Sequence, residues 1–132
     1  MKLLLDTHTF IWWASSSTKL PRNVRSYCED PANILLFSVV SVWEMQIKIR
    51  MGKLKLSHPL ADLIAHHRRV NQMQVLPAVL EHVLALDALP SHHKDPFDRL
   101  LIAQAIVEGV FLVSGDPEFS RYPVKLLWRG HP

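Results

Sequence analysis

The sequence has little cysteine and no long apolar run, and each absence excludes a class of protein. Its single cysteine, Cys28, cannot form an internal disulfide, which is typical of a reducing cytoplasm. Asp6 interrupts the amino-terminal apolar run after Leu3–Leu5, so that run is too short for a secretory signal. The longest apolar stretch, residues 34–43, is too short and too rich in serine to span a bilayer. We therefore expect a cytoplasmic protein without a membrane segment.

Length and composition predict one ordered domain covering residues 1–132. The chain is 48% hydrophobic, enough for a sizeable core without disulfides. Its formal net charge is only +3, from 15 basic and 12 acidic residues, which does not by itself identify a nucleic-acid-binding protein. The basic residues between Gln46 and Leu56 are more informative, because no acid lies among them. They fit either a solvated helix end or a surface that attracts phosphates.

Strand-like and helix-like segments alternate along the chain. Short apolar runs predict strands at 3–5, 34–39, 74–76, 110–114 and 124–128. Helical periodicity and capping signals predict helices at 7–14, 22–29, 41–51, 57–69, 79–89 and 97–108, with a helical turn at 117–121. This order indicates right-handed βαβ crossovers. The expected fold is α/β, with a central, mostly parallel sheet of about four to five strands flanked by helices.

Acidic residues occur where these elements change. Asp6 closes the first strand, Asp116 follows the strand at 110–114, and Glu44 and Asp98 lie near the starts of two helices. In a parallel sheet the carboxyl ends of the strands share one edge, where α/β folds bind ligands. Carboxylates gathered there repel one another unless a cation neutralises them. An all-carboxylate set favours a hard divalent ion.

Helix capping offers a simpler explanation for each acid taken singly. Ser41 and Glu44 have the spacing of a capping box, and Asp95 before Pro96 fits an N-cap that leaves Asp98 at the third helical position. Asp116 precedes a proline in the same way, and Asp6 fits a turn former. Asp98, however, lies on the apolar face of its helix, where a second cap is not needed. The repetition of the pattern favours a metal site.

Taken together, these motifs resemble the PIN-domain nucleases, in particular the VapC-type toxins of prokaryotic toxin–antitoxin pairs. The resemblance covers essentially the whole chain and rests on residues 4–8 with Trp12 and Trp13, 38–44, 48–56, 93–104, and 112–117 with Phe119. Asp6, Glu44, Asp98 and Asp116 fall on the family's acidic positions, and Ser114 matches its Ser or Thr. Gly115 departs from the pattern, because many relatives carry a larger polar or basic residue there.

The resemblance implies an endoribonuclease that uses Mg²⁺ or Mn²⁺, one or two ions per active site, to activate water. Asp6, Glu44 and Asp98 would hold one ion, Asp116 would act at a second site or through water, and Ser114 would orient water or Asp116. Candidate phosphate contacts are Lys48, Lys94 and Arg99, although Lys48 also has the spacing of an ion pair with Glu44. The implied partners are an RNA substrate, a cognate antitoxin and a second copy of the chain.

Other interpretations remain open at this stage. An aspartyl phosphatase would need a second Asp two residues after Asp6, where His8 stands. A PIN-like domain without catalytic activity, kept for protein interaction, is the main alternative. The histidine pairs lack zinc spacing, and His8 fits either the mouth of the site or a structural role. The four tryptophans could stack on bases, but they lie in apolar stretches, so we expect core packing, in particular for Trp43.

Overall fold

The sheet is the part of the fold that positions the site. In the computed structural model, which describes residues 1–91 and 95–128, it has the order β3-β2-β1-β4-β5, and every neighbouring pair is parallel. The strands are β1 (Lys2–Leu5), β2 (Ile34–Ser38), β3 (Gln74–Leu76), β4 (Phe111–Val113) and β5 (Leu126–Leu127). The predicted α/β fold with a parallel sheet of about five strands is confirmed.

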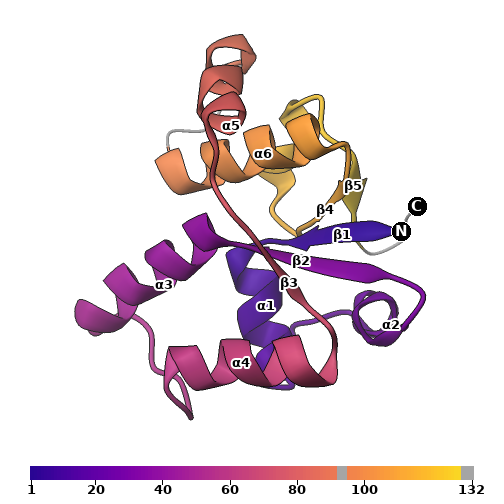
Figure 1. Cartoon of the computed structure of the whole chain (residues 1–132), viewed down its shortest axis with the longest axis vertical. Coiled ribbons are helices and arrows are strands. Elements are labelled where there is room, and N and C mark those ends of the chain that lie inside the picture. Colours follow the sequence, from indigo (N-terminus) through magenta and orange to yellow (C-terminus); the bar gives the residue numbers. More distant parts are fainter. Residues whose placement is uncertain (92–94, 129–132) are drawn as a thin grey trace.

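Helices cover both faces of this sheet (Figure 1). They are α1 (Thr7–Ala14), α2 (Arg22–Glu29), α3 (Val39–Arg50), α4 (Leu60–Val70), α5 (Leu80–Leu84) and α6 (Pro96–Glu108), with 3-10 helices η1 (Ala85–Ala88) and η2 (Pro117–Arg121). None of those in the described ranges is long and apolar enough to cross a membrane.

Alternation along the strands divides the core into two halves. Leu3 and Leu5 of β1 pack with Phe10 and Trp13 of α1, whereas Leu4 points to the other face and packs with residues of α6. Register places Leu4 beside Leu36 and Leu112, so the same face is apolar across the three central strands. Because both faces are covered, the strands read as continuous apolar runs.

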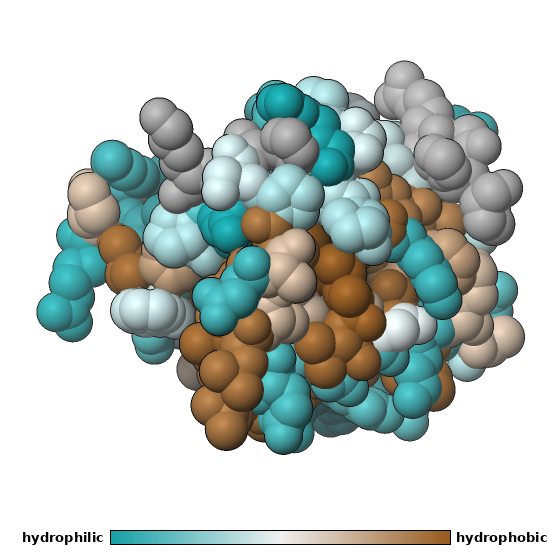
Figure 2. Space-filling model, turned by 90° about the horizontal axis from the view of Figure 1, so that it is seen from above, coloured by the Kyte–Doolittle hydropathy of each residue, from teal (hydrophilic) through white to brown (hydrophobic). Residues whose placement is uncertain are grey.

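Several predicted helix boundaries were wrong. The helix predicted at 57–69 begins only at Leu60, with Pro59 as its N-cap. The strand predicted at 34–39 ends at Ser38, because Val39 is the first residue of α3. Ser38 is the N-cap of this helix, and its hydroxyl accepts a hydrogen bond from the Val40 amide at 3.0 Å. The capping box predicted from Ser41 and Glu44 is therefore absent. The helix predicted at 79–89 ends at Leu84 and continues as η1, which leaves Leu80, Val83 and Leu84 exposed. Figure 2 looks down on this end of the molecule, where apolar surface gathers.

A buried polar network joins the end of β2 to α5 and α6. Gln104 is fully buried; its amide oxygen accepts a hydrogen bond from Ser38, and its amide nitrogen donates to the Pro77 carbonyl at 3.2 Å. His82 accepts a hydrogen bond from the Val79 amide and reaches Glu108 at 2.8 Å through its other nitrogen. Each link satisfies a group that burial would otherwise leave without a partner.

We predict that Gln104→Met destabilises the protein by about 1–3 kcal/mol, because it leaves the Ser38 hydroxyl and the Pro77 carbonyl without this partner. Urea unfolding followed by circular dichroism measures the loss. Val107→Met, on the exposed side of the same helix, is the matched control and should change stability by less than about 0.5 kcal/mol. Equal effects of the two substitutions would contradict a structural role for the network.

Candidate active site

Asp6 lies at the carboxyl end of the central strand and begins α1. Its side chain caps that helix, accepting a hydrogen bond from the Thr9 amide at 2.8 Å, while its own amide donates to the Val113 carbonyl of β4 at 3.1 Å. The residue is only 6% exposed. Burial raises the pKa of the Asp6 carboxyl, although hydrogen bonds from Ser114 and Thr9 and the charge of His8 oppose the rise. An ionised Asp6 is thus incompletely compensated, which favours a cation at this point.

Ser114 links Asp6 to Asp116. It is buried immediately after β4, and its hydroxyl accepts a hydrogen bond from the Asp116 amide at 3.1 Å as well as interacting with Asp6. Asp116 in turn caps η2, where its carboxylate accepts a hydrogen bond from the Glu118 amide at 2.9 Å. The predicted capping role of Asp116 is confirmed, and Ser114 has the contact needed to orient it.

Glu44 reaches the same region from α3. It is 5% exposed, and its two carboxylate oxygens have different partners: the Thr7 hydroxyl donates to one at 2.6 Å, and the Lys48 ammonium lies 3.0 Å from the other. The predicted ion pair between Glu44 and Lys48 is confirmed. Sequence reasoning missed Thr7, although the hydroxyl directly after Asp6 was the available signal. Through Thr7, the first turn of α1 is tied to the acid of α3.

Asp98 lies in the first turn of α6 and is half-buried. Asp95 caps this helix, as predicted, and accepts hydrogen bonds from the Phe97 and Asp98 amides at 2.8 and 3.2 Å. The helix packs against α3, and the rings of Phe97 and Trp43 are 5.0 Å apart. Asp98 directly follows Phe97, and Glu44 directly follows Trp43. Each acid therefore comes immediately after one ring of this aromatic pair.

A pocket of about 270 Å³ opens at this edge of the sheet, lined by Asp6, Asp116, His8, Trp12 and Gly115 among others. His8 is exposed and lies at its mouth, with its ring 5.8 Å from that of Trp12. Of the two roles considered for His8, the structure favours the one at the mouth. Asp6 and Asp116 thus face a common hollow.

The side chain of Trp128 leaves no room for a side chain at Gly115. A Cβ atom at this position would lie 2.5 Å from Cε2 of the Trp128 side chain, closer than real side chains approach. A larger residue at this position is therefore incompatible with the observed packing of Trp128. The indole ring of Trp128 occupies the space that such a side chain would need.

The donor set suits a hard cation in its chemistry, since carboxylate oxygens are its members. Within residues 1–91 and 95–128, however, no three His, Cys, Asp or Glu side chains are already spaced to hold a metal ion. The Lys48 ammonium occupies one oxygen of Glu44. A positively charged group is thus already drawn to this carboxylate.

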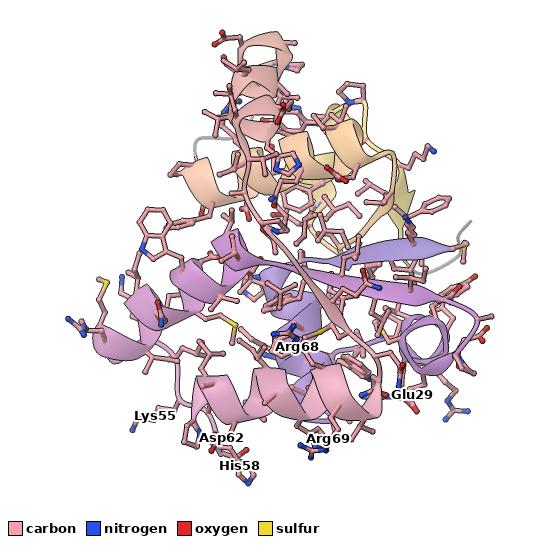
Figure 3. All side chains as sticks on the ribbon, in the orientation of Figure 1. Glu29, Lys55, His58, Asp62, Arg68 and Arg69 are labelled. Atoms are coloured by element: carbon pink, nitrogen blue, oxygen red, sulfur yellow. The ribbon has the colours of Figure 1, made fainter. Side chains whose placement is uncertain are left out.

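The remaining basic candidates are separated from the acids or used elsewhere. Arg99 donates to the Pro90 carbonyl at 2.8 Å and to the Leu86 carbonyl at 3.5 Å, which anchors the chain before α6. Lys94 lies outside the described residues. Figure 3 shows Arg68 and Arg69 on opposite sides of α4, so this pair does not form a single basic patch.

Comparison with known proteins agrees with this geometry. The family model of the PIN domain matches residues 3–125. Ribonuclease VapC22 from Mycobacterium tuberculosis is 30% identical over 118 residues, covering 86% of each chain. The fold is similar to VapBC2 from Rickettsia felis bound to a promoter DNA fragment (TM-score 0.74, 19% identity, 96% and 98% of the two chains). It is also similar to DNA-bound VapBC from Salmonella typhimurium (TM-score 0.68, 19% identity, 96% and 97%).

The matched region contains the whole sheet edge, from Asp6 after β1 to Asp116 after β4. The resemblance seen in the sequence motifs is therefore confirmed both by the family model and by a relative matched over most of its length. This chain belongs to the PIN-domain family.

Proposed function

We propose that this protein is an endoribonuclease that hydrolyses RNA phosphodiester bonds with the help of Mg²⁺ or Mn²⁺, and that it is the toxin of a toxin–antitoxin pair. The observation that best supports this function is the buried, incompletely compensated Asp6, which shares a pocket with Asp116 and is linked through Thr7 to Glu44. The relative named as a ribonuclease supports RNA as the substrate.

Asp6, Glu44 and Asp98 would hold one ion, and Asp116 would serve a second ion or act through water. Such an ion, when bound, supplies a Lewis acid that lowers the pKa of water and neutralises charge on the phosphate. The protein's own residues prepare this site. Ser114 positions Asp116 against Asp6, and Thr7 holds one oxygen of Glu44 so that its carboxylate faces α1.

Lys48 has a second role in this proposal. Its side chain is 35% exposed while that of Glu44 is 7% exposed, so the ammonium group lies on the solvent side of the pair. With a cation held at Glu44, the Lys48 ammonium would be available to contact a substrate phosphate. Lys94 remains a proposed phosphate contact, whereas the carbonyl partners of Arg99 give that residue a structural task.

We propose a cognate antitoxin and a homodimer as the protein partners. The similar structures of VapBC complexes support the first. Exposed apolar side chains on α5 support assembly, since Leu80 is 66% and Leu84 59% exposed. A PIN-like module without catalytic activity is the alternative, and binding of Mn²⁺ with RNA cleavage distinguishes the two.

We predict that Asp6→Asn reduces RNA cleavage by on the order of 100-fold or more, because it removes one anionic ligand of the cation. Asn still caps α1 and still accepts hydrogen bonds, so the fold should persist. Purified protein is incubated with total cellular RNA, with Mn²⁺ or EDTA, and the new ends are mapped by sequencing.

Asp62→Asn is the control for this substitution, because Asp62 lies on α4 and points away from the sheet in Figure 3. It should cleave RNA like the parent protein. In thermal melting, Mn²⁺ should stabilise the parent protein and Asp62→Asn but not Asp6→Asn. Cleavage that survives EDTA, or that Asp6→Asn retains in full, would rule out the metal-dependent mechanism.

The raised pKa of Asp6 predicts how stability depends on pH in the metal-free protein. A carboxyl whose pKa is higher in the folded than in the unfolded state stabilises the fold only while it is protonated, and this contribution is lost as pH rises through the folded pKa. In EDTA, Asp6→Asn should therefore match the parent protein below about pH 4 and exceed its stability near pH 7. Urea unfolding at both pH values measures the difference, and an advantage that shrank with rising pH would contradict the burial effect.

A further inference from the structure

Trp43 is placed unlike a core residue. Although it lies in an apolar stretch, 59% of it is exposed, so the expectation that it packs in the core was wrong. It directly precedes Glu44, and consecutive residues of a helix point about 100° apart. The buried Glu44 therefore faces α1, while the indole of Trp43 points in another direction from the same helix and is open to solvent.

Phe97 holds this indole in place. The two rings meet edge to face, with centroids 5.0 Å apart and planes inclined at 72°. Such a contact fixes the position of Trp43 and still leaves a broad ring surface open to solvent. Phe97 directly precedes Asp98, so this aromatic pair lies next to two of the proposed catalytic acids.

Trp43 also lines a hollow of about 580 Å³ on α3, which we call the α3 hollow. Its residues on α3 include Trp43, Gln46, Ile47 and Arg50, the spacing of one helical face. The face spans about 10 Å along the axis and carries in turn an aromatic ring, an amide, an apolar side chain and a guanidinium. This stripe runs beside the one that holds Glu44 and Lys48.

The charge around the α3 hollow has one sign. Two adjoining hollows share Leu60 with it and extend the surface to Lys55 and to Arg68. Among the described residues that line the three hollows there is no Asp or Glu. A surface that combines an open indole with cationic side chains suits a single nucleic-acid strand, whose bases stack on aromatic rings and whose phosphates contact cations.

We propose that Trp43 stacks on an unpaired base of the RNA beside the bond that is cut, and that Arg50 contacts the phosphate backbone of the same segment. The proposal rests on the ribonuclease function proposed above and adds a specificity-determining residue to it. A base already stacked within a duplex cannot lie on the indole, so the site selects RNA that is unpaired at this position.

The test measures binding apart from cleavage. The probe is a short fluorescent RNA spanning the strongest cleavage site mapped in total RNA, used alone and annealed to its complement. In the Asp6→Asn background, Trp43→Ala should raise the Kd for the single strand by roughly 5- to 150-fold, the range for loss of one base–aromatic stack. Trp43→Phe should retain most of the affinity, and binding of the duplex should change little.

Met51→Ala is the matched control, because Met51 is 58% exposed at the end of the same helix and lines none of the three hollows. With Asp6 intact, Trp43→Ala should raise KM while kcat stays near that of the parent, since stacking is present in both the bound substrate and the transition state. Arg50→Gln should weaken binding and reduce its dependence on salt.

Unchanged binding and cleavage by Trp43→Ala would overturn the stacking proposal while leaving the nuclease intact. Equal losses for Trp43→Phe and Trp43→Ala, or for single strand and duplex, would overturn it as well. A change confined to oligomeric state, measured by light scattering, would assign Trp43 to a protein interface instead. If the parent protein itself cleaves no RNA, the proposed function fails first and the stacking proposal fails with it.

Discussion

The carboxylate of Asp6 is buried where the central strand ends, and the groups around it partly offset the cost of burying its charge. Water is excluded, which raises the pKa of the carboxyl, and the surrounding groups offer hydrogen bonds from the first turn of α1 and from Ser114. These contacts lower the energetic penalty without cancelling the charge. Because Asp6 also caps α1, it cannot move away from the sheet without freeing the amide of Thr9. The start of α1 thus holds a buried carboxylate in a fixed position.

Glu44 is also a buried carboxylate, but different groups offset the cost of its burial. It is as buried as Asp6, but Lys48 supplies a positive charge one helical turn later and Thr7 supplies a hydroxyl. The two acids are therefore unequal: an ammonium group lies 3.0 Å from Glu44, whereas Asp6 accepts a hydrogen bond from the Thr9 amide and is affected by Ser114 and by the charge of His8. In the proposed metal site, a cation would compete with the Lys48 ammonium for the carboxylate of Glu44.

The fold was largely predictable because its signals are local. Buried parallel strands are apolar throughout, and a proline after Asp95 or Asp116 marks a helix start. The direction of individual side chains was less predictable, because it depends on which elements pack against each helix. The start of α3 at Val39 removes the capping box, whereas the contact of Glu44 with Thr7 and the exposure of Trp43 follow from how α3 packs in the fold. The buried roles of Gln104 and His82 depend on contacts between distant segments and had no local signal.

The contact between the rings of Trp43 and Phe97 joins the two helices that carry Glu44 and Asp98. Each ring is followed along its helix by a carboxylate, Glu44 in α3 and Asp98 in α6, and the two rings touch. Because successive helical residues diverge by about 100°, each acid points in a different direction from the ring that precedes it. The ring contact lies between the two helices, so it helps to fix the backbone positions from which Glu44 and Asp98 project.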